Sequence, residues 1–286
     1  MSEIHQKLEK MVDKMPAFPS SVNQILQLTA DINSPPKELI HVIEHDPVLT
    51  LKILKLVNSA YFGLSREVTS IKKSVVYIGL NSIKNISLSI AAIGVLPSKN
   101  ISGYSMNDFL IHSLTTAVIS RLLGKSKGVA EQDLGDYFVA SLLHDIGQLA
   151  LAQFFPELFQ QACELSKQQG ILIHEAEKEV IGEDHAMVGA MLAEKWKLPE
   201  NLIHCIRYHH RMDEFDQANV MDKSIFVANQ VSKLMLDEDK RLSGIEHMPE
   251  YIQSWLGMPL EEVAGSFENL DEEMDKTKLF IKLGRA

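Results

Sequence analysis

The sequence predicts an all-α fold. Apolar residues recur three and four positions apart along almost the whole chain, which is the period of a helix with one buried face. No run alternates apolar and polar residues between turn signals, as a half-buried strand would. The 286 residues are 45% hydrophobic and 23% charged, which is typical of a globular protein with a full core.

The N-terminal third predicts several short helices. Apolar residues recur at helical spacing among charges in residues 1–15, which is unlike a signal peptide. Residues 35–63 predict two helices, the second with Asp46 as N-cap and Pro47 at its first position. Capping explains the dipeptide His45-Asp46 fully, so we do not assign it to a functional site.

The middle of the chain continues with longer helices. We expect the helix in residues 70–96 to break at Gly79 and Gly94, before a polar link at 97–108. The helix in residues 108–125 is expected to close at Gly124, which basic residues flank. Start and stop signals then mark helices within 136–147, 156–170, 184–198 and 199–210.

Composition divides the chain into four segments. We expect an N-terminal helix at 1–15, a helical lobe at 16–100, a helical bundle at 101–235 and an acidic helical extension at 236–286. The extension carries the acidic runs "LDEDKR" and "ENLDEEMDK". It is expected to pack on the main body as helices or to be partly mobile.

The charge and the cysteine content limit the binding partners and the cellular location that the sequence predicts. The net charge of −10 argues against direct nucleic-acid binding. Residues 51–100 depart from this, with seven Lys/Arg residues against Glu67 alone. That basic face is either simply solvated or a docking surface for an acidic partner or a nucleotide. The two cysteines, Cys163 and Cys205, fit a reducing cytoplasm, and no apolar run is long enough to predict a membrane span.

Seven of the eleven histidines lie between residues 112 and 210. His174 lies at a helix start among charges expected to be solvated, and we interpret it as structural. His204 lies between apolar residues and carries no special signal. A lone histidine on an apolar helix is more often a hydrogen-bonded core residue than a ligand, so each needs support from the others.

His144-Asp145 differs because the pair lies within the apolar run "SLLHDIGQLALAQFFP". Burying an unpaired carboxylate costs several kcal/mol, and a bound cation would offset this cost. Histidines at four further helix positions offer a shared site: His112, His185, His209 and His210. Imidazole and carboxylate together suit Fe, Mn, Zn or Ni. The sequence favours a metal site over simple packing, without excluding the second.

The chain also resembles a known family. The segments "HDPVLTLKILKLVNSAYFG", "SIKKSVVYIGLNSIKNI", "LLHDIGQL", "DHAMVGAMLAEKWKLPENLIHCIRYHH" and "FVANQV" are similar to the HDOD domain of bacterial signalling proteins, within the HD superfamily of metal-dependent phosphohydrolases. The resemblance covers roughly residues 15–235. It implies a helical lobe packed on an HD-like bundle, and a regulatory output function in which signalling proteins or a nucleotide are the partners.

The resemblance also implies a ligand set. His112 matches the first histidine of the HD pattern, His144 and Asp145 match its namesake pair, and His185 matches a later histidine that opens a helix. His209 and His210 resemble the double histidine of the HD-GYP phosphodiesterases. Asp108, one turn before His112, is a further candidate, although it equally suits a helix start.

Departures from the family pattern bear on catalysis. Asn229 stands where HD hydrolases have a final aspartate, Gln148 replaces a lysine of the HD-GYP enzymes, and the GYP segment is absent. An amide is a poor ligand for a catalytic metal. We therefore expect a signalling module whose site binds metal but is catalytically impaired. The alternative is a metal-dependent phosphohydrolase that acts on a nucleotide or cyclic dinucleotide.

Overall fold

The computed structural model describes residues 3–31, 33–97, 100–101, 105–214, 218–236 and 244–285. These ranges are helical and contain no β-strand, which confirms the predicted all-α fold. In chain order the helices are α1 (Glu3–Lys14), α2 (Ser20–Ala30), α3 (Pro36–Glu44), α4 (Pro47–Val57), α5 (Ile71–Val95), α6 (Met106–Ser126), α7 (Leu134–Leu143), α8 (Ile146–Phe154), α9 (Pro156–Gln169), α10 (Ile173–Ile181), α11 (His185–Lys195), α12 (Glu200–Tyr208), α13 (Val220–Leu236), α14 (Glu250–Leu256) and α15 (Leu270–Arg285).

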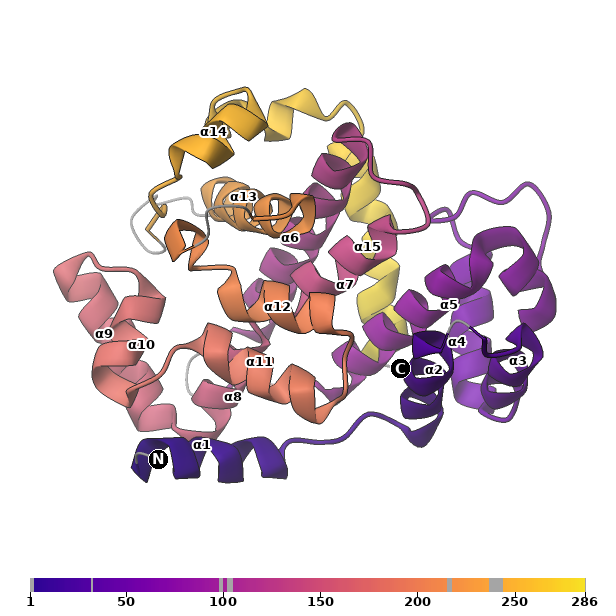
Figure 1. Ribbon diagram of the computed structural model, residues 1–286, viewed down its shortest axis with the longest axis horizontal. Helices are drawn as coiled ribbons and strands as arrows, with labels where there is room; N and C mark the ends of the chain where they lie inside the picture. The colour runs from indigo at the N-terminus through magenta and orange to yellow at the C-terminus, as the bar shows by residue number, and fades with distance from the viewer. Residues whose placement is uncertain are drawn as a thin grey trace.

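The helices form a lobe beside a bundle. Helices α2 to α4 and the first part of α5 make one end of the molecule, at the right of Figure 1. Helices α6 to α8 and α11 to α13 form the central bundle, and the antiparallel pair α9 and α10 lies at the far end. This is the predicted lobe packed on an HD-like bundle, although the segment limits predicted near residues 100 and 235 remain predictions.

The sequence predicts the role of one glycine correctly and of two others wrongly. Gly79 does interrupt α5, with a φ of 81° and a ψ of 163° that only glycine adopts readily. Gly94 and Gly124 do not end their helices, because α5 runs to Val95 and α6 runs to Ser126. At Gly94 a Cβ would lie 3.3 Å from the carbonyl oxygen of Gly284, so this glycine permits α5 to approach α15.

Aspartate side chains cap two helix starts, and the prediction for Asp46 is confirmed. The Asp46 side chain accepts a hydrogen bond from the backbone N–H of Leu49, with Pro47 at the first helical position. The Asp184 side chain accepts a hydrogen bond from the N–H of Met187, so α11 begins at His185 as expected. This cap fixes the direction in which His185 leaves the chain.

The C-terminal extension packs on the body. Helix α15 contacts both α5 of the lobe and α6 of the bundle, and Figure 1 shows it in yellow between them. Phe280 of α15 places its ring 5.0 Å from that of Tyr61 and 4.9 Å from that of Phe138. The extension therefore holds the lobe and the bundle together through aromatic contacts.

Helix α5 is long and apolar enough to cross a membrane by length and composition alone. Inside the protein 61% of its apolar window is buried, which is typical of a core helix.

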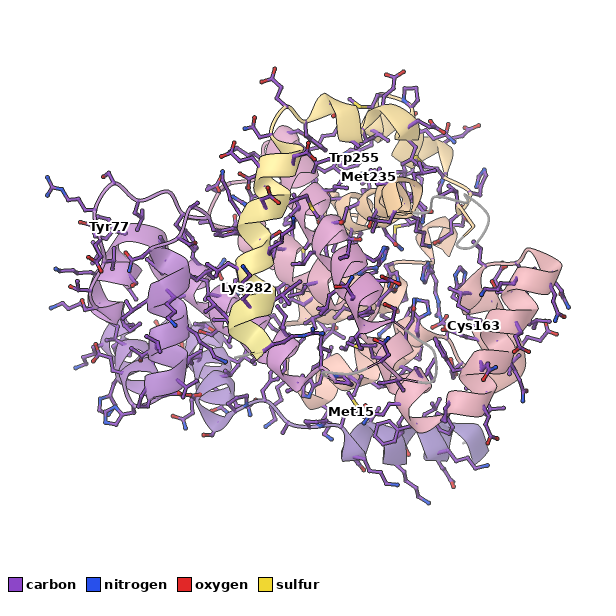
Figure 2. The ribbon with its side chains drawn as sticks, turned by 180° about the vertical axis from the view of Figure 1, so that it is seen from behind. Met15, Tyr77, Cys163, Met235, Trp255 and Lys282 are labelled. Carbon is purple, nitrogen blue, oxygen red and sulfur yellow. The ribbon has the colours of Figure 1, made fainter. Side chains whose placement is uncertain are left out.

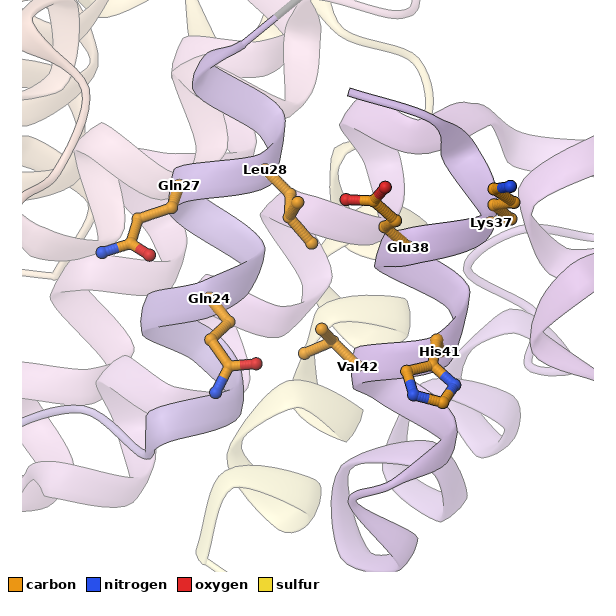
Figure 3. A pocket seen from close by; sticks show the side chains of 7 residues that line it. All are labelled: Gln24, Gln27, Leu28, Lys37, Glu38, His41 and Val42. Carbon is orange, nitrogen blue, oxygen red and sulfur yellow. The ribbon is translucent and has the colours of Figure 1, made fainter. Parts of the chain in front are cut away.

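A groove of about 550 Å³ opens in the lobe between α2 and α3, and Figure 3 shows its polar and apolar lining. This groove lies in the lobe, away from the histidine-bearing helices of the bundle.

Candidate metal centre

The pair His144-Asp145 lies at a break between two helices. Helix α7 ends at Leu143 and α8 begins at Ile146, so the pair forms the junction and not the continuous helix that the sequence predicts. A Cβ on Gly147 would lie 2.0 Å from the carbonyl oxygen of His185. The glycine therefore allows the first turns of α8 and α11 to touch, which brings Asp145 to His185.

Asp145 is the centre around which the predicted histidines gather. Its Oδ2 lies 3.3 Å from Nε2 of His112 and 3.3 Å from Nε2 of His144. Its Oδ1 lies 3.1 Å from Nε2 of His185 and 3.4 Å from Nε2 of His209. The two carboxylate oxygens thus serve two separate groups of ligand atoms.

His210 completes the second group. Its Nε2 lies 2.9 Å from Nε2 of His185. On the other side, the Nε2 atoms of His112 and His144 are 3.3 Å apart. The first position therefore has His112, His144 and Asp145, and the second has Asp145, His185, His209 and His210. These six residues are the ones that the sequence proposes as ligands.

Each of these histidines has its other ring nitrogen held by a neighbour. Nδ1–H donates to a main-chain carbonyl oxygen in His144 (Ser141, 2.6 Å) and His209 (Ile206, 2.7 Å). Carboxylates accept the Nδ1–H of two of the three histidines at the second position, His185 (Glu177, 2.6 Å) and His210 (Glu246, 2.8 Å). The fifth ring, His112, has the Ser232 hydroxyl 3.1 Å from its Nδ1.

These contacts fix the tautomers. A carbonyl oxygen or an ionised carboxylate can only accept, so the proton is on Nδ1 and Nε2 carries a lone pair. In the neutral rings the inward-facing atom is then a lone-pair nitrogen, whereas His185, whose pKa is raised, carries a proton on Nε2 toward Oδ1 of Asp145 when no metal is bound. Oδ1 of Asp145 and Nε2 of His209 are buried and have no hydrogen-bond partner.

Such a set of acceptors repels itself unless a cation lies among them, either a metal ion or the proton on His185. Bonds of about 2.0–2.2 Å to a transition metal place ligand atoms roughly 3–3.5 Å apart, and the contacts around Asp145 span 2.9–3.4 Å. Residues that orient histidine ligands through Nδ1 are typical of metal sites. The residues present therefore fit bound transition-metal ions.

The electrostatics agree with this donor set. Burial lowers the pKa of His112, His209 and His210, so their rings are held neutral. Burial alone would raise the pKa of the Asp145 carboxyl, but the surrounding histidines hold it well below its usual value. Burial opposes charge on His185 too, yet the Glu177 and Asp145 carboxylates keep its pKa well above its usual value.

Two further candidates lie outside the two groups. Asp108 is exposed in the first turn of α6, where its N–H is hydrogen-bonded to the Ser105 hydroxyl. Asn229 is fully buried on α13, and neither atom of its amide has a hydrogen-bond partner. It lies one turn before Ser232, which contacts His112, so Asn229 is on the face of α13 that is turned toward the first position.

Sequence reasoning missed three supporting residues. Glu177, Ser232 and Glu246 contact Nδ1 of three of the candidate histidines, and none of them was proposed. His174, which we interpreted as structural, is buried, and its ring stacks on that of His210 at 4.1 Å. The only available signal was the spacing of His174, Glu177 and Ile181, which share one face of α10 and are all buried.

A separate group unites His204, Cys205 and Asp222. Oδ1 of Asp222 lies 3.2 Å from Nδ1 of His204 and accepts a hydrogen bond from the thiol of Cys205 at 3.1 Å. Burial raises the pKa of Cys205 well above its usual value, which keeps it a thiol and a donor. Hydrogen bonding accounts for this group without a metal, and His204 carries no special signal in the sequence.

The pH dependence of metal binding follows from His185. A metal ion and a proton compete for its Nε2, and because its pKa is raised, protonation begins above the roughly 6.5 of a free histidine. We expect affinity at the second position to fall steadily as pH decreases from about 8 to 6. Titrations with Zn²⁺ across this range measure it. Affinity that is constant between these values would contradict the expectation.

The chain is similar to several known proteins. The HDOD domain family model matches residues 15–212. An uncharacterised protein of Treponema pallidum (strain Nichols) is 29% identical over 202 residues, which are 70% of this chain and 38% of that protein. This chain thus spans well under half the length of that curated relative.

Solved structures resemble the whole chain. A candidate phosphohydrolase from Shewanella amazonensis SB2B is 25% identical, with a TM-score of 0.69 and 97% of both chains covered. An HDOD domain protein of unknown function from Geobacter sulfurreducens is 24% identical, with a TM-score of 0.70 over 98% of this chain and 96% of the other. A candidate signal transduction protein from Marinobacter aquaeolei VT8 is 21% identical, with a TM-score of 0.72 over 99% of this chain and 66% of the other. The last two likenesses show the fold alone.

Proposed function

The chain belongs to the HDOD domain family, and from this membership we propose that it is a bacterial signal-transduction output module with an HD-like transition-metal centre. One observation carries the proposal. The Nε2 atoms of the histidines gather around both oxygens of Asp145, and a hydrogen-bond partner on the outer side of each ring contacts its Nδ1. Fe, Mn, Zn and Ni suit this donor set. A cytoplasmic location, consistent with the free cysteines Cys163 and Cys205, is part of the proposal.

Burial favours a structural or sensory metal over a catalytic one. The side chains of His144, His185 and His209 are inaccessible, and His112, the most exposed of the ligands, has only 18% of its side chain accessible. A bound metal can acidify water and polarise a phosphoryl oxygen, but a substrate must reach it. Asn229 supplies no charge where a hydrolase would have its last carboxylate.

The experiment joins elemental analysis to activity. The purified chain is expected to contain transition metal and to turn over none of a panel of phosphoesters in the presence of Fe²⁺, Mn²⁺, Zn²⁺ or Ni²⁺. Protein that contains no transition metal and takes up none of these four ions would overturn the proposal.

The second candidate is a metal-dependent phosphohydrolase that acts on a nucleotide or cyclic dinucleotide. The complete His and Asp set of the second position favours it, as does the likeness to the Shewanella protein described as a candidate phosphohydrolase. Turnover of a nucleotide phosphoester at roughly one per second or faster in the same assay would establish this candidate instead.

Asn229→Asp tests the reason proposed for impaired catalysis. The new carboxylate lies on the face of α13 turned toward His112, and it should tighten metal binding at the first position by about tenfold or more. Without metal it is a buried charge, so the metal-free variant should be less stable by about 3 kcal/mol. Calorimetric titration and thermal unfolding measure both. Unchanged affinity would mean that Asn229 does not face the metal.

We propose that the lobe is the partner surface. Val48 and Leu51 of α4 and Val76 and Tyr77 of α5 are each more than half exposed, with lysines beside them at positions 52, 55, 72 and 73. Figure 2 shows Tyr77 at the edge of the lobe. Exposed apolar side chains among lysines suit an acidic signalling protein with apolar contacts of its own, and a nucleotide ligand is the alternative.

Cross-linking tests this surface. A photoreactive residue in place of Tyr77 is expected to capture a specific protein in cells, and Lys72→Glu with Lys73→Glu should abolish the adduct. The same residue in place of Met258, which is exposed in the extension, is the control. Equal capture from both positions would contradict the proposal that the lobe is the partner surface. An adduct that still forms after the charge reversal would contradict it too.

A further inference from the structure

Glu246 lies in the C-terminal extension, 34 residues beyond the segment that the family model matches. It is nevertheless buried against the second metal position, where its Oε1 accepts the Nδ1–H of His210 at 2.8 Å. Glu177 plays the same part for His185. The second position is therefore supported by two carboxylates, one from the bundle and one from the extension.

Helix α13 fixes Glu246 in place. The Gln230 side chain donates to Oε1 of Glu246 at 2.9 Å, and its own Oε1 accepts the backbone N–H of Glu246 at 3.0 Å. Nζ of Lys233 lies 3.3 Å from the same carboxylate oxygen. Three contacts thus hold the segment 244–249, here called the latch, through this one residue.

His210 has little freedom left. Its Nδ1–H is held by Glu246, its ring stacks on that of His174 at an interplanar angle of 17°, and its Nε2 points at the second position. Removal of the latch would leave the ring free to turn and its Nδ1–H without a buried acceptor. Supporting residues of this kind change metal affinity by about 10–100-fold.

We propose that Glu246 is a positioning residue that ties the latch to the second metal position through His210, so that metal binding there and docking of the latch depend on each other. This inference rests on the proposed metal centre. Because linkage is reciprocal, a partner that lifts the latch weakens metal binding, and metal binding secures the latch by the same factor. The extension is then a route by which a signal reaches the centre.

The test uses the full chain and Co²⁺ as the probe. Glu246→Gln should weaken Co²⁺ binding at the second position by about 10–100-fold while the first position binds as before. Glu261→Gln, which makes the same charge change at an exposed site of the extension, is the matched control and should bind like the unaltered chain. Amide hydrogen exchange of residues 244–249 should slow when Co²⁺ binds, and should not slow in Glu246→Gln.

The outcomes separate the two claims. If the unaltered chain binds no Co²⁺ and contains no other transition metal, the proposed metal centre fails and the latch fails with it. If it binds Co²⁺ and Glu246→Gln binds it equally at both positions, the latch alone is wrong. Exchange that is equally fast with and without Co²⁺ in the unaltered chain would also overturn the coupling.

Discussion

Replacing Asp145 by asparagine is expected to remove metal from both positions at once. Its two oxygens serve different groups, Oδ2 with His112 and His144 and Oδ1 with His185 and His209. The amide keeps the volume but removes the only carboxylate in either group. Metal content should fall from about two ions per chain to nearly none, since metals of this kind usually need three or more protein ligands.

The same substitution should also destabilise the metal-free protein. The neighbouring histidines hold the pKa of Asp145 well below its usual value, so the ionised carboxylate stabilises the fold and its loss should lower the free energy of unfolding. Asp108→Asn is the control, because that carboxylate is exposed and belongs to neither group. Elemental analysis and denaturant unfolding measure the two effects. Asp145→Asn protein that retains two ions would contradict the shared-carboxylate arrangement.

Gly147→Ala is expected to lower the free energy of unfolding by a large amount for a substitution that adds a single methyl group. The new Cβ would lie 2.0 Å from the carbonyl oxygen of His185 and 2.8 Å from the backbone nitrogen of Gly189. Both are backbone atoms of α11, which no rotamer change can move aside. Overpacking typically costs about 1–3 kcal/mol, and we expect the upper end of that range or more.

The same substitution should also weaken metal binding. Separation of α8 from α11 moves Asp145 away from His185, so affinity at the second position should fall along with stability. Gly265→Ala is the matched control, since nothing lies within 4 Å of its added Cβ, and it should change stability by no more than about 0.5 kcal/mol. Denaturant unfolding of metal-free protein compares the two. Equal stability of both variants would show that α8 and α11 are not in contact at Gly147.

Local sequence signals were sufficient to predict most of the fold. Helical periodicity and the aspartate caps at positions 46 and 184 act within a few residues, so they can be interpreted from sequence alone. Gly94 and Gly124 were misinterpreted as helix ends because a glycine also permits the close approach of two helices. Only the partner atom, which is distant in the sequence, distinguishes these two uses.

The same contrast holds at the site. The six proposed ligands could be recognised in the sequence because each is a histidine or aspartate that is conspicuous among apolar neighbours, and the fold brings them together. Glu177 and Glu246 were missed because glutamates among other charges look solvated, and their histidine partners lie 8 and 36 residues away. Burial, which reveals them, is a property of the folded chain.

Anomalous diffraction from a crystal of the chain, recorded at the absorption edge of its metal, tests the central claim most directly. We predict two peaks, one on each side of Asp145. One should lie among Oδ2 and the Nε2 atoms of His112 and His144, and the other among Oδ1 and the Nε2 atoms of His185, His209 and His210. No peak at Asp145 in protein that contains metal, or a peak only at His204, Cys205 and Asp222, would contradict the account.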